Sequence, residues 1–340
     1  MDLRPRFDAT TQAFLPAIEA VLDAVPRESC PPGSTLPEMC AYHLGTGGKR
    51  IRALVPLLVA QDLGTDPADL VPFGAACEML HNATLVHDDL QDGDTVRRGE
   101  PTVWRRFGEA QAVNLGDAMF YFALLCLDRL AFPPERRARV ARLLLVETLR
   151  VIDGQEREFA LKTLEAPTLE AYTRMVEGKT SGLFVLPLQG AALLCGAPAE
   201  VESALCEAAR HLGVLFQIQD DVLDLYGEKG RGERGSDLAE GKRSVLVLHA
   251  LAHAPVPDAA WLTALLDAPR EAFTPAHAAR AAELFRSSGS LAFAIDGIRA
   301  RRERARAALA RWPALAELAE GLCDLSLGPI HGILLEEGRP

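Results

Sequence analysis

The sequence lacks paired cysteines. Its 340 residues include seven cysteines, an odd number, and no two of them form a Cys-x-x-Cys motif. A disulfide framework or a structural zinc site would need an even set or closely spaced thiols. We therefore expect free thiols in a reducing compartment and a cytoplasmic location.

A net positive charge and long apolar runs are also missing. Lys and Arg number 36 against 47 Asp and Glu, which gives a net charge of −11. An acidic surface repels phosphate backbones, so we expect no nucleic acid partner, although a local basic pocket is compatible with this charge. No basic stretch followed by an apolar run opens the sequence, and no window holds 18 uncharged, apolar residues. We expect no signal peptide and no stable membrane insertion.

Strand signals are scarce as well. Apolar residues recur instead at helical spacing, as in Leu54, Leu57 and Leu58, and Ala and Leu dominate the composition. The chain is long enough to bury a sizeable core, and its gaps between helical segments are short. The sequence therefore predicts an all-α fold, a single-domain helical bundle of roughly a dozen helices over residues 1–340.

Two segments stand out from this pattern. Residues 226–243 hold five glycines and a high density of charge, which predicts a mobile surface loop with a function. Residues 298–311 form a basic helix. We interpret it as a solvated helix face with charge pairs, the alternative being a helix that binds a membrane surface or nucleic acid.

The first chemical motif is the acidic segment HNATLVHDDLQD at residues 81–92. On a helix, Asp88 and Asp92 lie one turn apart on one face, about 5–6 Å from each other, and would repel as anions. A divalent cation removes this conflict, and Mg²⁺ combines a few carboxylates with water and phosphate oxygens. His81 lies two turns earlier on a similar face. Taken alone, this motif is equally compatible with a solvated acidic helix.

The second motif, FQIQDDVLD at residues 216–224, repeats the acidic spacing with Asp220, Asp221 and Asp224. The surrounding residues are apolar, so these carboxylates should be buried, and buried charge must be paired or coordinated. Two such helices that face each other in a bundle would bind several Mg²⁺ ions.

Basic residues accompany the acidic motifs. Lys49 and Arg52 follow two glycines, Arg97 and Arg98 follow the first acidic motif, and Lys179 and Lys242 lie further along the chain. Arg suits bidentate phosphate contacts and Lys supplies a point charge. Metal-binding acids together with phosphate-binding bases indicate a diphosphate substrate. Neither a Walker A motif nor a G-x-S-x-G motif occurs, and no cysteine stands out as a nucleophile.

With these motifs, the chain resembles the trans-isoprenyl diphosphate synthases, or polyprenyl synthetases. The resemblance covers about residues 40 to 250 and rests on ordered segments that include GGKRIR, HDDLQDGDTVRRGEPT, NLGDAMF, GQEREF, KTSGLF, FQIQDDVLD and GSDLAEGK. It implies an all-α bundle around a deep central cavity and a homodimer.

The resemblance also implies a role for individual residues. Asp88, Asp92 and Asp220 would bind Mg²⁺, three ions per active site, with Asp89, Asp221 and Asp224 in support. The residues implied to hold the allylic diphosphate are Arg97, Lys179, Thr180, Gln217 and Lys242. The residues implied to hold isopentenyl diphosphate are Gly48, Lys49, Arg52, His81 and Arg98. The catalytic set would comprise Asp88, Asp89, Asp92, Arg97, Lys179, Asp220, Asp221 and Lys242.

Two positions depart from the family pattern. Glu158 stands where the family usually has Asp in its G-Q-x-x-D motif, so its role is open. The glycine-rich loop lacks the usual Gly-Lys before its G-x-D-L motif, and either Arg231 or Arg234 could replace that lysine.

The implied activity is Mg²⁺-dependent chain elongation, in which isopentenyl diphosphate condenses with an allylic diphosphate by a 1′-4 linkage. Loss of the diphosphate leaves an allylic cation, so water must be excluded. One alternative is a class I terpene cyclase, which needs no second diphosphate site. The other is a subunit of a heteromeric prenyl synthase, which would be inactive alone.

Product length depends on the residues below the metal site. The growing tail should run along the helix that carries Asp88, past Thr84, Ala83, Leu80 and Met79, at about 5.4 Å per turn. Ala83 and Thr84 are small, so nothing there stops growth early. Aromatic residues of segment 119–122, Phe120 among them, could form the floor or could be ordinary core packing. We expect geranylgeranyl diphosphate, with farnesyl or a longer polyprenyl diphosphate as neighbouring possibilities, and Ala83→Phe should shorten the product.

Overall fold

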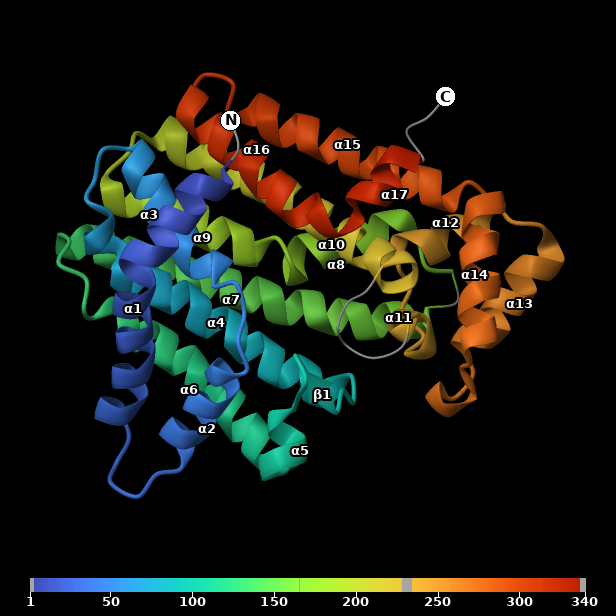
Figure 1. The fold of residues 1–340 in the computed structure, drawn as a ribbon, viewed down its shortest axis with the longest axis horizontal. Coiled ribbons are helices and arrows are strands. Elements are labelled where there is room, and N and C mark those ends of the chain that lie inside the picture. The colour runs from blue at the N-terminus through green and yellow to red at the C-terminus, as the bar shows by residue number, and fades with distance from the viewer. Residues whose placement is uncertain (1–2, 165, 228–233, 337–340) are drawn as a thin grey trace.

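The computed structural model describes residues 3–164, 166–227 and 234–336, and nearly all of them lie in helices (Figure 1). The α-helices are α1 Arg4–Ser29, α2 Leu36–Gly45, α3 Ile51–Asp62, α4 Val71–Gln91, α5 Val103–Phe107, α6 Glu109–Leu127, α7 Pro134–Thr163, α8 Leu169–Lys179, α9 Gly182–Cys195, α10 Ala199–Tyr226, α11 Ser236–Ala239, α12 Val245–His253, α13 Val256–Leu266, α14 Pro275–Ser287, α15 Ser290–Ala308, α16 Pro313–Leu327 and α17 His331–Glu336. Three short 3₁₀ helices, η1 Pro67–Leu70, η2 Arg270–Ala272 and η3 Gly328–Ile330, join some of them. The all-α prediction is confirmed.

Local sequence explains where these helices begin and end. Proline occupies the first turn of several, including α7 and α14, where its missing N–H is not needed. The side chains of Thr168, Ser244 and Thr274 accept hydrogen bonds at the starts of α8, α12 and α14. Gly196 ends α9 in the left-handed region, at φ 72°.

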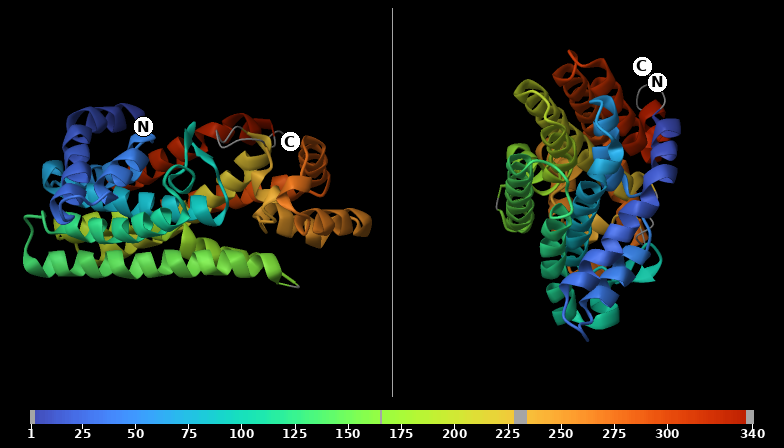
Figure 2. Two further views of the ribbon diagram at one scale, coloured as in Figure 1. Left: turned by 90° about the horizontal axis from the view of Figure 1, so that it is seen from below. Right: turned by 90° about the vertical axis from the view of Figure 1, so that its left-hand side faces the viewer.

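Helices α4 and α10 form the centre of the bundle. α4 packs against α6, α3 and α9, while α10 packs against α9, α15 and α8. The long α7 lies on the outer side of the bundle in both views of Figure 2, next to α8 and α9. Buried apolar side chains form one connected cluster that extends from Leu3 to Ile330. Single-domain organisation over residues 1–340 stays a prediction.

A small hairpin follows α4 directly. Strand β1, Val96–Arg97, pairs antiparallel with β2, Glu100–Pro101. Arg98 and Gly99 between them both have positive φ angles, 53° and 86°, as a two-residue hairpin turn requires. The turn brings Arg97 and Arg98 back toward the end of α4.

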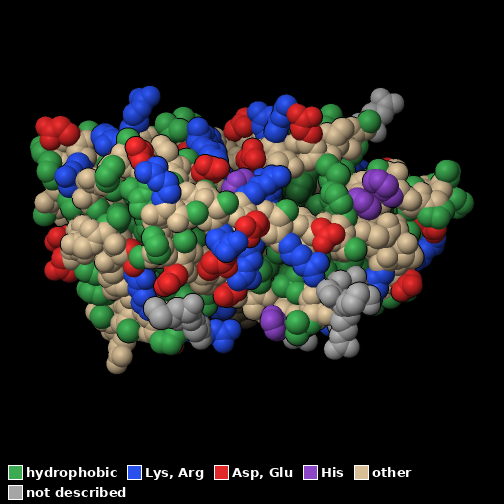
Figure 3. All heavy atoms as spheres, turned by 90° about the horizontal axis from the view of Figure 1, so that it is seen from above, with side chains coloured by type: hydrophobic (Ala, Val, Ile, Leu, Met, Phe, Trp, Pro, Cys, Tyr) green, Lys and Arg blue, Asp and Glu red, His purple; other side chains and the backbone are tan. Residues whose placement is uncertain are grey.

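The two unusual segments have different outcomes. Within 226–243, residues 228–233 lie outside the described residues, whereas α11 and the residues after it are ordered against the bundle. The basic helix is the C-terminal part of α15. Its Arg302 pairs with Glu320 and Asp324 of α16, and positive and negative side chains are interspersed on this face (Figure 3). It is therefore a surface helix with charge pairs, as predicted.

Two helical stretches, Glu109–Leu127 and Pro313–Leu335, are long and apolar enough to cross a membrane by length and composition alone. Both pack against other helices of the bundle, α6 against α4 and α16 against α10 and α15. Core helices of ordinary globular proteins pass the same test.

Candidate active site

One cavity of about 770 Å³ lies among α4, α6, α7, α8 and α10 and is bordered by residues 237–244. Its volume falls within the range of small-molecule sites. Both acidic motifs contribute to its wall: Asp88 and Asp92 from the end of α4, and Asp220 and Asp221 from α10. The structure thus brings together two motifs that lie more than 120 residues apart in the sequence.

The carboxylates of the first motif differ in their electrostatic surroundings. Burial raises the pKa of Asp88, and the nearby charge of Asp92 adds to the shift, while Lys179 opposes it. Burial would also raise the pKa of Asp92, but the Lys242 ammonium, 3.1 Å from Asp92 Oδ2, lowers it below its ordinary value. Asp92 Oδ1 is buried and has no hydrogen-bond partner among the described residues.

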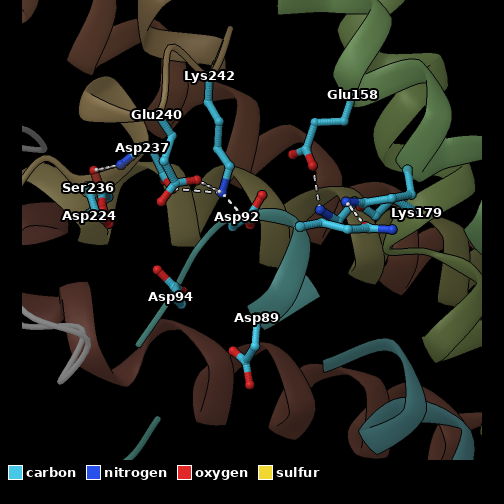
Figure 4. Close-up of polar contacts among 12 residues, drawn as sticks. Asp89, Asp92, Asp94, Glu158, Lys179, Asp224, Ser236, Asp237, Glu240 and Lys242 are labelled. Atoms are coloured by element: carbon cyan, nitrogen blue, oxygen red, sulfur yellow. Dashed lines mark hydrogen bonds and ion pairs between the residues drawn. The ribbon is translucent and has the colours of Figure 1, made fainter. Parts of the chain in front are cut away.

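Asp89 points away from Asp92 (Figure 4). Its carboxylate is buried and accepts hydrogen bonds from Arg97 Nε at 2.7 and 2.8 Å. Arg97 lines the cavity, whereas Asp89 does not. Each helical residue is rotated by about 100° from the last, so Asp89 does not share the cavity face of Asp88. Asp89 holds the cavity-lining Arg97, and its expected supporting role at the metal site stays a prediction.

The carboxylates of the second motif also have different contacts. Asp221 accepts hydrogen bonds from the Tyr172 hydroxyl at 2.7 Å, from Gln217 Nε2 at 3.0 Å and from the Val245 amide at 3.1 Å. Burial, and next the charge of Asp237, raise the pKa of Asp221 to about 7.

Asp224 lies outside the cavity wall. It accepts hydrogen bonds from Ser236 Oγ at 2.7 Å and from the Asp237 amide at 3.2 Å. It therefore fixes the start of α11 to α10, and its expected supporting role stays a prediction.

Lys179 is placed by a close crossing of α7 and α8. A Cβ on Gly154 would lie 2.0 Å from the Lys179 amide nitrogen, so only glycine allows the two backbones to approach. The Lys179 ammonium pairs with Glu158 at 2.5 Å. Burial opposes the charge of Lys179, but Asp88 and Glu158 outweigh it and raise the lysine pKa. Glu158, whose role was open, thus orients a cation in the cavity.

Thr180 and Gln217 connect the two halves of the site. The Thr180 hydroxyl donates to Gln217 Oε1 at 2.8 Å, and Gln217 donates in turn to Asp221. All three residues line the cavity.

Lys242 is surrounded by carboxylates. Its ammonium lies 3.1 Å from Asp92, 3.4 Å from Asp237 and 2.8 Å from Glu240 (Figure 4). Burial disfavours the ammonium, but Asp237 and Asp92 raise the Lys242 pKa well above its ordinary value. The lysine carries a full positive charge beside the first acidic motif.

A second group of cations lies in the same cavity. Arg52 Nη1 is 3.2 Å from His81 Nε2, and the Arg52 guanidinium lies over the Phe184 ring at 5.4 Å. Burial, with the charge of Arg52 next, lowers the pKa of His81 well below its ordinary value, so the imidazole is neutral at pH 7. Arg98 also lines the cavity and donates to the Gly47 carbonyl.

Two residues expected near this group do not reach the cavity. Gly48 and Lys49 are exposed and absent from its wall. A Cβ on Gly48 would lie 2.8 Å from Arg98 Nη1, so this glycine makes room for the arginine. The glycine turn at Gly47 and Gly48 thus contributes to the cavity indirectly, because it positions Arg98.

Known proteins match this arrangement. Residues 34–284 match the sequence profile of the polyprenyl synthetase family. The chain belongs to that family. It is 38% identical over 211 residues to the geranylgeranyl diphosphate synthase of Methanosarcina mazei, covering 62% of this chain and 65% of that protein. It is 35% identical over 238 residues to the (2E,6E)-farnesyl diphosphate synthase of Mycobacterium bovis, covering 65% and 66%.

The chain thus spans just under two thirds of the length of these curated relatives. The structural likeness covers more. The crystal structure of geranylgeranyl pyrophosphate synthetase from Pyrococcus horikoshii Ot3 matches with a TM-score of 0.84 and 28% identity, over 96% of this chain and 98% of that one. The all-α polyprenyl synthetase fold is therefore common to both.

In this polyprenyl synthetase chain, the residues expected to set product length divide into two groups. Thr84 and Phe120 line the cavity. The residues that are buried in the core and absent from the cavity wall are Met79, Leu80 and Ala83. At about 100° per residue, Met79 and Ala83 lie on the opposite side of α4 from Asp88, and the Met79 sulfur is 3.9 Å from Cys40 Sγ on α2.

The wall near Phe120 includes a residue that the sequence did not indicate. The rings of His87 and Phe120 have centroids 5.6 Å apart and are tilted by 59°. A Cβ on Gly116 would lie 2.2 Å from His87 Nε2, so the glycine gives the imidazole its place.

The donor set of the cavity fits Mg²⁺. No group of three or more His, Cys, Asp or Glu side chains among the residues that the structure describes is close enough to hold a metal ion by itself. Mg²⁺ is bound in proteins by one or two carboxylates, with water and substrate phosphates as further ligands. Asp88, Asp92 and Asp220 supply such carboxylates, and Asp92 Oδ1 is buried without a hydrogen-bond partner.

Several charged residues at the site were missed. Asp94 and Asp237 belong to the motif segments that carried the family resemblance, so their motifs could have indicated them. Glu240 and Arg243 also lie in or beside such a motif. Arg270 gives no sequence signal, since it lies in a connection between α13 and α14. Of the two candidate loop arginines, Arg231 lies outside the described residues, and Arg234 is exposed and absent from the wall.

Proposed function

We propose that this polyprenyl synthetase condenses isopentenyl diphosphate with an allylic diphosphate, with a 1′-4 linkage, and depends on Mg²⁺. One observation carries the proposal. A single cavity holds carboxylates from two helices, Asp88 and Asp92 on one side and Asp220 on the other, together with separate groups of cations. The names of the relatives support the same reaction class.

Two groups of cations support two diphosphate substrates. Lys179 and Lys242 lie beside the carboxylates and would bind the allylic diphosphate, whose departure needs the metal. Arg52 and Arg98 lie in another part of the wall, next to the neutral His81, and would bind isopentenyl diphosphate. A terpene cyclase, which acts on one diphosphate, would not need this second group.

The residues of the chain perform three tasks in this reaction. Lys179 and Lys242 hold the allylic diphosphate and stabilise the charge that grows on it as the carbon–oxygen bond breaks. Arg52 and Arg98 orient isopentenyl diphosphate so that its double bond meets the resulting cation. The apolar side of the cavity excludes water, which would quench the cation. Asp88, Asp92 and Asp220 would hold Mg²⁺, with three ions expected, and the bound metal would supply further positive charge to the leaving diphosphate.

We propose geranylgeranyl diphosphate as the product. Thr84 lies one turn below Asp88 on the cavity face of α4, next to Leu85, and it is small enough to let a chain pass. His87 and Phe120, whose rings are in contact, also line the cavity and are candidates for the residues that limit the chain.

We propose a homodimer in the cytoplasm, without membrane insertion. Large apolar side chains are exposed on the neighbouring helices α6 and α7, among them Tyr121 and Leu149, each 67% exposed. On α7 they recur as Leu145, Leu149 and Ile152, the spacing of a seam that packs on another helix. Such patches mark interaction surfaces, and α7 lies outermost in Figure 2.

Purified protein with isopentenyl diphosphate and a series of allylic primers tests this proposal. Elongated diphosphates should appear in mass spectra with Mg²⁺ and disappear with a chelator. Asp88→Asn and Asp220→Asn should lower the rate by roughly 10²–10³-fold while the fold is kept. The matched control, Asp153→Asn, changes an exposed carboxylate of α7 outside the cavity and should leave the rate unchanged.

The other outcomes distinguish the alternatives. Conversion of a single allylic diphosphate to a hydrocarbon without isopentenyl diphosphate would identify a terpene cyclase. Absence of any turnover by a folded, pure protein would favour a subunit of a heteromeric synthase. Elongation that persists in the chelated sample would contradict the metal-dependent mechanism.

A further inference from the structure

Arg270 makes an unusual set of contacts next to the candidate site. It lies in η2, far along the chain, yet its Nη1 donates to the Asp92 carbonyl at 2.6 Å. Its Nη2 lies 3.3 Å from Asp94 Oδ1 and 3.6 Å from Glu240 Oε1. One guanidinium thus connects the end of α4 with the segment that carries Lys242.

These contacts form a closed ring of charged groups. Glu240 contacts both Arg270 and the Lys242 ammonium, and Lys242 contacts the Asp92 carboxylate. Arg270 completes the ring at the Asp92 main chain. Asp92 is therefore held at both ends: Lys242 binds its side chain and Arg270 binds its carbonyl.

The contacts of Arg270 differ from those of an ordinary solvated surface charge in two respects. The Asp92 carbonyl follows the last turn of α4, where carbonyl groups lack helical partners and a nearby cation is favoured. The acceptor side chains are largely shielded, Asp94 being 17% exposed and Glu240 7% exposed. An ordinary exposed ion pair, by contrast, contributes little to stability and does little to hold its two side chains in place.

We propose that Arg270 is a positioning residue of the active site, a clamp that sets Asp92 and Lys242 relative to each other. Arg270 itself does not line the cavity, and it acts through the two residues that it fixes. Its effect on catalysis rests on the proposed function, because it assumes that Asp92 binds Mg²⁺ and that Lys242 binds the allylic diphosphate. Its effect on the structure does not.

Hydrogen–deuterium exchange on the metal-free protein tests the clamp directly. The amides to follow are Asp92, which donates to the Asp88 carbonyl, and Lys242, which donates to the Asp237 carbonyl. In Arg270→Ala, peptides covering 88–95 and 235–245 should exchange several-fold faster than in the wild type. Exchange in α10 and in the rest of the core should be unchanged.

Arg280→Ala is the matched control. Arg280 lies on α14 in the same part of the fold, is similarly exposed, and contacts Asp258 and Trp261 instead. This variant should leave exchange in both peptides unchanged. Equal exchange in Arg270→Ala and the wild type would overturn the proposal, and so would faster exchange spread over the whole chain with a lowered Tm, which indicates a merely structural role.

Kinetics supply the second measurement. Residues that orient metal ligands typically affect metal affinity or activity by about 10–100-fold. Arg270→Ala should therefore raise both the Mg²⁺ concentration for half-maximal rate and the KM for the allylic diphosphate by about tenfold, with the KM for isopentenyl diphosphate unchanged. Arg270→Lys, which keeps the charge, should recover part of this loss. Equal changes in both KM values would contradict the clamp, whereas a wild type without elongation would overturn the proposed function and leave the exchange result standing.

Discussion

Adjacent aspartates in the first acidic motif have different tasks. Asp88 faces the cavity, while Asp89, one residue on, is buried against Arg97 in a bidentate ion pair. Removing one partner of a buried pair typically costs about 3–5 kcal/mol because the other charge is left uncompensated. The doubled aspartate therefore combines a candidate metal ligand with a structural anchor for Arg97, which lines the cavity.

One buried histidine, His43 of α2, contributes to the stability of the protein in acid. His43 is buried, and burial, followed by the charges of Arg97 and Arg98, lowers its pKa to about 3. Between about pH 3 and pH 6.5, His43 is therefore neutral in the folded state, whereas it is protonated in the unfolded chain. His43 is neutral in both states above pH 6.5, so it destabilises the fold only as the pH falls from about 6.5 toward 3.

We predict that His43→Gln makes the free energy of unfolding less dependent on pH in the acid range. The free energy of unfolding of the wild type should decline between about pH 6.5 and pH 3, and the variant should lose a smaller part of it. Urea unfolding at several pH values measures the difference. The control, His253→Gln, removes an exposed histidine and should follow the wild type. Parallel curves for wild type and His43→Gln would contradict the prediction.

At the scale of single elements, α4 has two faces with different surroundings. Its face with Thr84, Asp88 and Asp92 borders the cavity, while Ala83 and Met79 pack into the core on the opposite side. A helix rotates by about 100° per residue, so neighbouring positions meet different surroundings. Product length should depend on position 84 and not on position 83.

We predict that Thr84→Phe shortens the main product to fifteen carbons or fewer, because a ring there fills the cavity below Asp88. Ala83→Phe should leave the product distribution unchanged and destabilise the fold by about 1–3 kcal/mol through overpacking. Mass spectrometry of the products and urea unfolding distinguish the two variants. A shorter product from Ala83→Phe with unchanged stability would show that the cavity extends along the other face of α4.

Phe120 on α6 offers the complementary change. Phe120→Ala removes a ring from the cavity wall and leaves His87 without its aromatic neighbour. Longer products should appear in the same assay. Phe122→Ala is the control, since Phe122 is buried and absent from the wall, so it should cost stability without changing the product. Equal lengthening by both variants would contradict this assignment.

At the scale of the whole molecule, the neighbouring helices α6 and α7 expose several large apolar side chains. α6 is an apolar helix, and only 44% of its most apolar window is buried. The exposed residues of α6 and α7 adjoin the cavity, whose wall includes Ile152 and Phe159. A second copy of the chain on this side would cover the patch and the edge of the cavity together.

We predict that Leu145→Glu with Leu149→Glu converts the proposed homodimer to monomer. Two charges in the centre of an apolar interface should raise the dissociation constant by at least about a hundredfold. Light scattering after size-exclusion chromatography at micromolar concentration measures the mass. The control, Val256→Glu, places a charge at a residue of α13 that is 82% exposed and should leave the dimer intact. A wild type that is monomeric at this concentration would contradict the proposed assembly.

The sequence by itself determined the fold class of this protein, its two acidic helices and several of its cavity residues. Helical periodicity and the scarcity of strand signals predicted the all-α fold, because these features act within one or two turns of the chain. The spacing of Asp88 with Asp92, and of Asp220 with Asp224, predicted the two acidic helices for the same reason. The motifs that carried the family resemblance also named Lys179 and Lys242, which the structure places in the cavity.

Only the tertiary structure decided which residues of these motifs share the cavity. Whether Asp89, Asp224 or Ala83 faces it depends on how α4 and α10 are rotated against neighbours that are distant in sequence. Arg270 meets Asp92 across 178 positions, and no local pattern marks such a contact. Periodicity fixes the faces of a helix relative to each other, whereas long-range packing decides what each face meets.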